Sequence, residues 1–479
     1  MKTLKTALVS FILLLGIAVR LYNITAPLAD YHSWRQVDTA STAKIFVEEG
    51  FNLLEPKYHD LSNTQSGLDN PNGYRMVEFP LYNAVFAFLY QQFNHFQIEF
   101  YGRLISILAY AVSAVIIFYL LNKELNFTTA VIGLLNFSFL PFMVFFTRVV
   151  LPEPTAMALG LTAVFFGYRF YKARTKRKAI LFYTLSLICF AVAILVKPTA
   201  VFLGIILLYY FSRRYDIFVF TRPQFYLYFL LSIVPFILWR IHIAKYPEGI
   251  PASTWLLTSV QTSSGPQQIF FKPAFFYWII FERITNLILG GLLVFYFIYG
   301  IIKNNSWFVR IFLISMTAYL LVFQGGNVQH EYYQTLIFPA VSIITAAGFY
   351  SFSKELKNKT LSILIFIILF GFSIYFSFVK VKGYYRIPPD LVSYSKIIEK
   401  VTEPNSNIVT DRNGDTTLLY LSNRKGSAVL IEDINKLKQY NYKYIVLTNK
   451  DKKQELIDKY SQNLKEVFTS DELTILEIL

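Results

Sequence analysis

The feature that most constrains this chain is a series of hydrophobic stretches, each close to the length that crosses a bilayer. Hydrocarbon is spanned by a helix of about 20 predominantly apolar residues, and 55% of the 479 residues are hydrophobic. The sequence therefore predicts an all-α polytopic membrane protein. The stretches lie near residues 6–22, 80–94, 101–121, 128–146, 154–171, 179–196, 198–212, 224–243, 284–302, 307–323, 333–352 and 359–379.

Basic loops predict the orientation of these stretches. The run from Lys172 to Lys178 is the strongest cytoplasmic marker, and Arg213-Arg214 agrees with it. Membrane crossings can be counted backward from this marker or forward from a cytoplasmic Met1. The two counts give the same orientation only if one early stretch does not cross the membrane. The short stretch 80–94 is our choice, which leaves eleven crossings. The segments that then fall outside are 23–80, 148–154, Lys197, 244–275, 324–333 and the C-terminal region.

The composition changes after Arg386, where Ile387-Pro388-Pro389 marks a boundary. Helical and strand patterns then alternate, which predicts a small α/β domain on the extracytoplasmic side. We therefore expect a membrane-embedded catalytic domain over 1–384 and a soluble domain over 385–479. From Tyr385 onward, fourteen Lys and Arg balance fourteen Asp and Glu, so the net charge of +15 belongs to the membrane part. Positive-inside loops and anionic lipid explain that excess, and no nucleic-acid partner is predicted. The expected elements are helices at 390–401, 431–440 and 453–460, and strands at 407–410, 444–447, 464–468 and 473–479.

The first outer loop, residues 23–80, concentrates polar side chains that membrane surfaces usually avoid. Apolar residues recur at helical spacing after Asp38, which predicts an amphipathic surface helix ending near Gly50. The group Asp30, His32, Arg35 and Asp38 offers a general base and a cation for a phosphate. The alternative is that Asp38 only caps or solvates the surface helix.

Other polar groups stand at predicted outer ends of helices. Glu78, just before Pro80, suits catalysis and helix capping about equally. Glu153 suits a helix start, whereas the guanidinium of Arg148 is a preferred bidentate partner of phosphate. Lys197 is a second such cation, although either cation could simply extend its charged head to the membrane surface.

The stretch 327–334 carries His330, Tyr332 and Tyr333, more polar aromatic groups than a membrane-interface belt requires, and predicts a sugar or phosphate contact. No Gly-rich phosphate loop, zinc motif or Ser/His/Asp order appears in the sequence. We therefore predict no metal-binding motif and no bound cofactor, while the sequence leaves the need for a divalent metal open. The only cysteine, Cys189, lies in an apolar run, which excludes disulfides and thiolate clusters.

In this order, these pieces resemble the GT-C glycosyltransferases, in particular the protein O-mannosyltransferase and aminoarabinose-transferase-like (ArnT-like) branch. The resemblance implies an inverting transfer of one hexose or pentose from a polyprenyl-phosphate carrier to a protein, lipid or cell-surface glycan on the outer face of the cell membrane. An acidic residue of the first outer loop would be the base, and Arg and Lys would hold the carrier phosphate. The motifs are Glu78-Phe79-Pro80-Leu81, Gly102-Arg103-Leu104-Ile105-Ser106, Arg148 with Leu151-Pro152-Glu153-Pro154, Lys197-Pro198, and His330 with Tyr332-Tyr333.

The chain departs from the family pattern in the outer loop. Counting back from Gly50, the family's Asp-Glu pair falls on Arg35-Gln36. The base must then be Asp38, Asp30 or His32, in that order of preference, and phosphate binding would rely on Arg103, Arg148 and Lys197. Three other readings remain open: an oligosaccharide ligase or polymerase using diphosphate lipids, a secondary transporter, and a membrane scaffold.

Overall fold

The computed structural model describes residues 2–479, so Met1, which we predict to be cytoplasmic, lies outside it. The chain forms two compact units. The membrane unit comprises the chain up to Ile24, Arg103–Trp239 and Ser253–Gly383, and the loop–tail unit comprises Thr25–Gly102, Arg240–Ala252 and Tyr384–Leu479. Contacts thus group most of the first outer loop with the C-terminal region, whereas the division at 384/385 stays a prediction.

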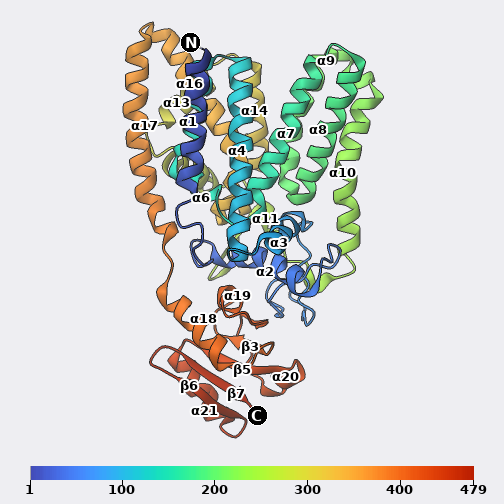
Figure 1. Ribbon diagram of the computed structural model, residues 1–479, viewed down its shortest axis with the longest axis vertical. Coiled ribbons are helices and arrows are strands. Elements are labelled where there is room, and N and C mark those ends of the chain that lie inside the picture. Colours follow the sequence, from blue (N-terminus) through green and yellow to red (C-terminus); the bar gives the residue numbers. More distant parts are fainter. Residues whose placement is uncertain (1) are drawn as a thin grey trace. The chain divides into compact units, whose positions relative to one another are not determined.

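The membrane unit is almost entirely helical, as predicted. The helices α1, α4, α7, α8, α10, α16 and α17 are its long elements, and they are drawn as extended helical ribbons in Figure 1. Only a short hairpin interrupts the helical pattern within this unit's described residues. Its elements are α1 (Lys2–Arg20), α4 (Ile98–Glu124), α5 (Phe127–Phe139), α6 (Pro141–Phe146), α7 (Pro152–Lys172), α8 (Lys176–Val196), η1 (Pro198–Leu203), α9 (Gly204–Tyr215), η2 (Asp216–Thr221), α10 (Pro223–Ile243), α11 (Trp255–Thr258), β1 (Ser259–Thr262), β2 (Gly265–Gln268), α12 (Pro273–Phe276), the π-helix η4 (Tyr277–Ile288), α13 (Val294–Lys303), α14 (Trp307–Val322), α15 (Gln324–Gln329), η5 (Glu331–Ile337), α16 (Phe338–Leu356), α17 (Lys359–Val381) and η6 (Lys382–Tyr385).

By length and composition, six helical segments of residues 2–479 could cross a membrane, or up to seven if the bent pair α13 and α14 is one span. This confirms several apolar helices, while the count of eleven crossings stays a prediction. The stretch 80–94 forms α3 (Leu81–Phe93), which has 13 residues. A helix of that length is too short to span, in agreement with the expectation that this stretch does not cross.

A glycine contact fixes the crossing of α13 and α16. A Cβ at Gly348 would lie 1.7 Å from the carbonyl oxygen of Tyr296, and one at Gly300 would lie 2.1 Å from that of Ile344. Small residues let helix backbones approach closely in membranes, where dispersion contacts replace the hydrophobic effect between helices. These two positions therefore require glycine.

The loop–tail unit contains a five-stranded mixed sheet, drawn at the C-terminal end of the chain in Figure 1. The strand order is β4-β3-β5-β7-β6, with β3 parallel to β4 and β5, and β7 antiparallel to β5 and β6. The C-terminal α/β region is thus confirmed. Its elements are α18 (Pro389–Val401), β3 (Asn407–Thr410), α19 (Thr417–Leu421), β4 (Gly426–Ser427), α20 (Ile434–Gln439), β5 (Tyr442–Leu447), α21 (Lys450–Tyr460), β6 (Leu464–Thr469) and β7 (Thr474–Ile478).

Side-chain alternation gives this sheet two apolar faces. Ile408 and Val446 pack on one face with residues of α18 and α19, whereas Val409 and Ile445 pack on the other with residues of α20 and α21. Helices on both faces bury both sides, as parallel strands require. Ala29 of the outer loop belongs to the first of these clusters, so the loop contributes directly to the core of the C-terminal region.

The outer loop also extends the sheet at its β4 edge. The amide of Leu61 donates to the carbonyl of Gly426 at 2.7 Å, and the amide of Gly426 donates to the carbonyl of His59 at 2.9 Å. A Cβ at Gly426 would lie 1.8 Å from the carbonyl oxygen of Ile408, so only glycine fits there. The edge strand is thereby covered by the loop instead of being left unpaired.

The helix predicted in the outer loop exists but is not amphipathic. It is α2 (Ser33–Glu49), and it ends at Gly50, whose φ of +96° suits a glycine cap. Every residue from Arg35 to Ala43 is buried, so over this stretch the helix has no polar face turned to water. The predicted solvated polar face is therefore wrong, because polar residues of the loop and tail pack around it. The location of this helix at the membrane surface stays a prediction.

Candidate active site

Asp38 lies at the centre of a buried polar network in the loop–tail unit. Its side chain is 1% exposed. Oδ1 accepts a hydrogen bond from Thr416 at 2.7 Å, and Oδ2 accepts one from Gln65 at 3.0 Å and forms an ion pair with Arg75 at 3.1 Å. Both carboxylate oxygens are thus held, one by Thr416 just before α19 and the other by Gln65 and Arg75 of the outer loop. This arrangement is typical of a carboxylate that links separate segments of the chain within a folded core.

Asp60, which sequence reasoning missed, belongs to the same network. It is fully buried, and its Oδ1 accepts from the amide of Ser62 at 2.9 Å. Burial raises the pKa of Asp60 from 3.8 to about 6; the Ser62 hydrogen bonds lower it, the nearby Asp38 carboxylate raises it further, and Arg75 lowers it. Arg75 therefore forms an ion pair with Asp38 and, by its charge, also favours the ionised form of Asp60.

Asp30 lies in a separate, tightly held segment just before α2. Its Oδ1 accepts from Nε2 of Gln36 at 2.7 Å, and the same amide donates to the carbonyl of Tyr31 at 3.0 Å. Tyr31 stacks on Tyr384, with ring centroids 4.0 Å apart, and its amide donates to the Tyr384 carbonyl. His32 adopts a φ of +56°, which is uncommon for a residue with a side chain. Such backbone strain is concentrated at functional segments of proteins.

Arg35 and Glu78 form an ion pair of 2.8 Å that joins α2 to the segment preceding α3. Asn83 of α3 reinforces this junction by donating to the carbonyl of Thr39 at 2.6 Å. Glu78 lies before the cap residue Pro80, and its carboxylate is directed to Arg35. Three of the four outer-loop candidates thus have defined partners: Asp30 contacts Gln36, Arg35 contacts Glu78, and Asp38 contacts Thr416 of the tail.

In the membrane unit, the predicted arginines converge on the chain just after α1. Arg103 of α4 donates to the carbonyl of Ile24 at 2.9 Å, and Arg148 donates to the carbonyl of Asn23 at 3.1 Å. Both guanidinium side chains are essentially fully buried. Two arginines that are distant in sequence are therefore directed to adjacent peptide groups. Ionisable residues inside a membrane domain usually indicate a functional site.

Arg20, at the end of α1, is a third buried arginine that sequence reasoning missed. Its guanidinium donates to Oγ1 of Thr147 at 2.7 Å and to the carbonyl of Ser138 at 2.9 Å, and it lies 3.3 Å from the ring centroid of Tyr110. An arginine that closes an apolar stretch was the available signal. That signal is weak, because an arginine at a helix end usually extends toward water.

Lys197 and Glu153 form a buried ion pair, with Nζ 2.7 Å from Oε1. The ammonium also lies 5.1 Å from the ring centroid of Tyr333. Glu153 is in the first turn of α7, where the helix dipole favours a carboxylate. The structure thus brings together three of the predicted residues, and Lys197 already has a carboxylate beside it.

The predicted stretch 327–334 forms an aromatic stack next to a second ion pair. His330 and Tyr332 are parallel within 10°, with centroids 5.2 Å apart, and Tyr332 contacts Tyr333 at 4.8 Å. Glu331 pairs with Arg283 of η4 at 2.6 Å. Arg283 was missed although it interrupts an apolar run, which was the only signal for it. Among residues 2–479, no group of three or more His, Cys, Asp or Glu side chains could hold a metal ion.

The chain has a polytopic helical membrane fold that is similar to the fold of GT-C glycosyltransferases, as the sequence resemblance predicts. Residues 78–240 match the family model of the dolichyl-phosphate-mannose-protein mannosyltransferases. No curated protein matches the sequence.

Among solved structures, the chain is similar to ArnT from Cupriavidus metallidurans bound to undecaprenyl phosphate, with 13% identity, 98% of each chain covered and a TM-score of 0.69. The apo state of that protein gives 12% identity, the same coverage and a TM-score of 0.68. The Archaeoglobus fulgidus oligosaccharyltransferase AglB, in complex with an inhibitory peptide and a dolichol-phosphate, gives 10% identity over 93% of this chain and 69% of that chain, with a TM-score of 0.56. This chain therefore shares its fold over nearly its whole length with ArnT.

Proposed function

We propose that this protein is an inverting glycosyltransferase that moves one sugar from a polyprenyl-phosphate carrier to an acceptor on the extracytoplasmic face of the cell membrane. The observation that carries the proposal is the convergence of Arg103 and Arg148 on adjacent carbonyls of residues 23 and 24, immediately before the outer loop. The fold shared with a protein bound to undecaprenyl phosphate supports the same kind of carrier. The multi-pass topology with eleven crossings and an outer C-terminal domain remains part of the proposal.

Asp30 is the general base of this reaction. It takes the proton of the acceptor hydroxyl, whose oxygen attacks the anomeric carbon as the bond from that carbon to the carrier phosphate breaks. Thr416, Gln65 and Arg75 hold both oxygens of Asp38, which suits a positioning role for that residue. Gln36 holds the Asp30 carboxylate in one orientation, as a preorganised base requires.

Arg103 and Arg148 bind the carrier phosphate and stabilise the charge that it gains as leaving group, because guanidinium groups match phosphate oxygens bidentately. Lys197 is oriented by Glu153 and adds a cation to this role. His330, Tyr332 and Tyr333 contact the sugar. Arg35, Glu78 and Asp38 position the outer loop through the ion pairs that they form.

The test uses the purified full chain in lipid nanodiscs and a panel of polyprenyl-phosphate sugars, with release of carrier phosphate as the readout. Asp30→Asn should lower the release rate by roughly 100- to 10,000-fold, the usual contribution of a general base, while the melting temperature stays unchanged. Asp38→Asn should lower both activity and melting temperature, because it leaves Arg75 buried without its carboxylate. Asp458→Asn, at an exposed position of α21, is the matched control.

Three results would refute parts of this proposal. Full activity of Asp30→Asn would exclude Asp30 as the base. Release of a diphosphate carrier with transfer of a whole oligosaccharide would identify the protein as a ligase. The similarity in fold to the oligosaccharyltransferase AglB supports this alternative. Solute uptake into proteoliposomes without any release would identify a transporter.

A further inference from the structure

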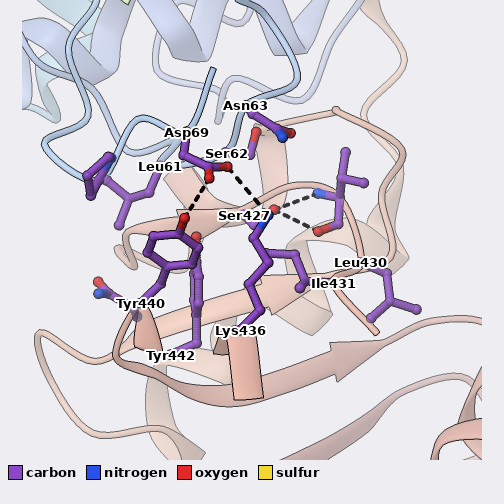
Figure 2. A pocket seen from close by; sticks show the side chains of 13 residues that line it. Leu61, Ser62, Asn63, Asp69, Ser427, Leu430, Ile431, Lys436, Tyr440 and Tyr442 are labelled. Carbon is purple, nitrogen blue, oxygen red and sulfur yellow. Dashed lines mark hydrogen bonds and ion pairs between the residues drawn. The ribbon is translucent and has the colours of Figure 1, made fainter. Parts of the chain in front are cut away.

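The loop–tail unit contains a pocket whose lining is partly polar and partly apolar, and none of the residues proposed above lines it. It has a volume of about 170 Å³. Figure 2 shows its walls, which come from the outer-loop segment 61–71, from the strands β3, β4 and β5, and from α20 with the loop before it. We name it the loop–tail pocket. The residues that define it are Leu61, Ser62, Asn63, Asp69, Pro71, Asn407, Ser427, Val429, Leu430, Ile431, Lys436, Tyr440 and Tyr442.

The walls of this pocket are fastened to one another. Asp69 accepts a hydrogen bond from the hydroxyl of Tyr440 at 2.5 Å and lies 3.6 Å from Nζ of Lys436, as the dashed lines in Figure 2 indicate. The paired backbone of residues 59–61 and Gly426 fixes the same loop segment from its other end. Ser427 is held by the amide and carbonyl of Val429. The pocket is therefore a built feature of the fold.

The chemistry of the lining restricts what it can bind. The single cation, Lys436, is balanced by Asp69, so a phosphate or another anion would find no excess positive charge. The amide of Asn63 offers donors and an acceptor, whereas the amide of Asn407 already donates to the carbonyl of Asn441 and offers its oxygen. The tyrosine rings and the aliphatic side chains of the lining offer an apolar surface for the C–H faces of a ring. A neutral molecule with several hydroxyl groups, which both donate and accept, satisfies such a lining. An apolar ligand would leave these polar groups desolvated.

The size of the pocket restricts the ligand further. Pockets for drug-sized ligands have volumes of roughly 300 to 1,000 Å³, and about 170 Å³ leaves room for only one small ring. A single pyranose or furanose has that scale, with hydroxyls around its edge and C–H groups on its faces. We propose that the loop–tail pocket binds one neutral sugar residue of a glycan.

The consequence for activity rests on the proposed function. If the protein transfers sugars, the loop–tail pocket recognises a sugar residue of an acceptor glycan. This narrows the acceptor class from protein, lipid or glycan to a glycan that already carries a neutral sugar. The binding itself does not depend on transfer, so the two proposals can fail separately.

The test uses NMR to measure the transfer of magnetic saturation from the full chain in nanodiscs to neutral monosaccharides. Inorganic phosphate and a hexose phosphate serve as charged comparators. One or more neutral sugars should give a saturable signal. Asn63→Ala should weaken binding roughly 3- to 10-fold, the effect of removing one hydrogen bond. Asn63 is exposed, so the variant should fold, and the exposed Asn435, which does not line the pocket, provides the matched control Asn435→Ala.

A second variant keeps the test decisive. Tyr440→Phe retains the ring but loses the hydrogen bond to Asp69, and it should weaken sugar binding while the melting temperature changes little. The inference is overturned if no neutral sugar gives a saturable signal, if the charged comparators bind in preference, or if both pocket variants bind sugar as the wild type does. Carrier-phosphate release without sugar binding would overturn this inference alone, and sugar binding without release would overturn only the transferase.

Discussion

The substitution Asp60→Asn should stabilise the protein at neutral pH and have no effect in acid. Asp60 is buried beside the Asp38 carboxylate, and its pKa is raised from 3.8 to about 6. A raised folded-state pKa means that the folded protein keeps a proton that the unfolded chain has released. Stability therefore falls as the pH rises from about 4 to 6, and the full cost of the buried charge is present above pH 6.

The magnitude follows from the two pKa values. The difference between 3.8 and about 6 corresponds to about 3 kcal/mol at 1.36 kcal/mol per pKa unit. Asparagine has no charge to bury and can still accept from the amide of Ser62. At pH 8 the variant should thus be more stable by about 3 kcal/mol, a rise in melting temperature of roughly 6 to 12 °C for a cooperative unit of ordinary domain size.

The neighbouring His59 also makes the stability depend on pH, in the direction opposite to Asp60. Burial, aided by the nearby Lys44 and Lys425, lowers the pKa of His59 from 6.5 to about 3, so this residue lowers stability as the pH falls below about 6.5. In the wild type the two groups oppose each other between pH 4 and 6. In Asp60→Asn only His59 remains, and stability should decline steadily with acidification.

The assay is thermal unfolding of the full chain in nanodiscs between pH 4 and pH 8, for wild type, Asp60→Asn and the exposed control Asp458→Asn. The melting-temperature difference between Asp60→Asn and wild type should grow with pH and vanish near pH 4, while the control shows no such trend. A variant that is less stable than wild type at pH 8, or a difference independent of pH, would refute the reasoning. Either result would mean that the ionised carboxylate is needed by Arg75 or Ser62.

Three further predictions concern other parts of the molecule. Arg75→Met should destabilise the loop–tail unit by about 3 to 5 kcal/mol, because it leaves Asp38 buried without its ion pair, and thermal unfolding would reveal it; an unchanged melting temperature would contradict this. Arg148→Lys should weaken polyprenyl-phosphate binding roughly tenfold, because an ammonium cannot make the bidentate contact of a guanidinium. A binding measurement in nanodiscs tests this, and equal affinity of variant and wild type would contradict the proposed role of Arg148 in binding phosphate. Gly426→Ala should push β4 away from β3, because the new Cβ would meet the carbonyl of Ile408, and the shift should also weaken the loop's bonds to Gly426. Hydrogen exchange at the amide of Leu61 should become faster, and unchanged protection there would contradict this prediction.

The elements of the C-terminal region could be predicted because each carries a local pattern. Strand β3 has the predicted bounds, and α18 and α21 begin within three residues of the predicted positions. The missed elements are α19, with five residues, and β4, with two. Elements this short have no periodicity to detect, and they exist because longer neighbours and the outer loop supply their partners.

The candidate site could be predicted by residue type but not by partner. The bond from Thr416 to Asp38 joins residues 378 apart in sequence, and no local signal indicates it. Asp38 is the first choice of base from the sequence, yet its carboxylate is held by that contact and by Arg75. Asp60 has no signal in its local sequence, because its raised pKa comes from burial by residues elsewhere in the chain.

The same long-range contacts indicate that the C-terminal region supports the structure of the outer loop. Ala29 lies in its core, residues 59–61 pair with its edge strand, and Thr416 holds Asp38. The loop that supplies the proposed base therefore folds together with the tail, although none of the proposed base or phosphate-binding residues belongs to the tail. A helix as polar as α2 gains little from its own sequence, since tertiary packing supplies most helical stability in proteins. The tail accordingly acts as the scaffold that keeps the outer loop, and with it Asp30, in a single conformation.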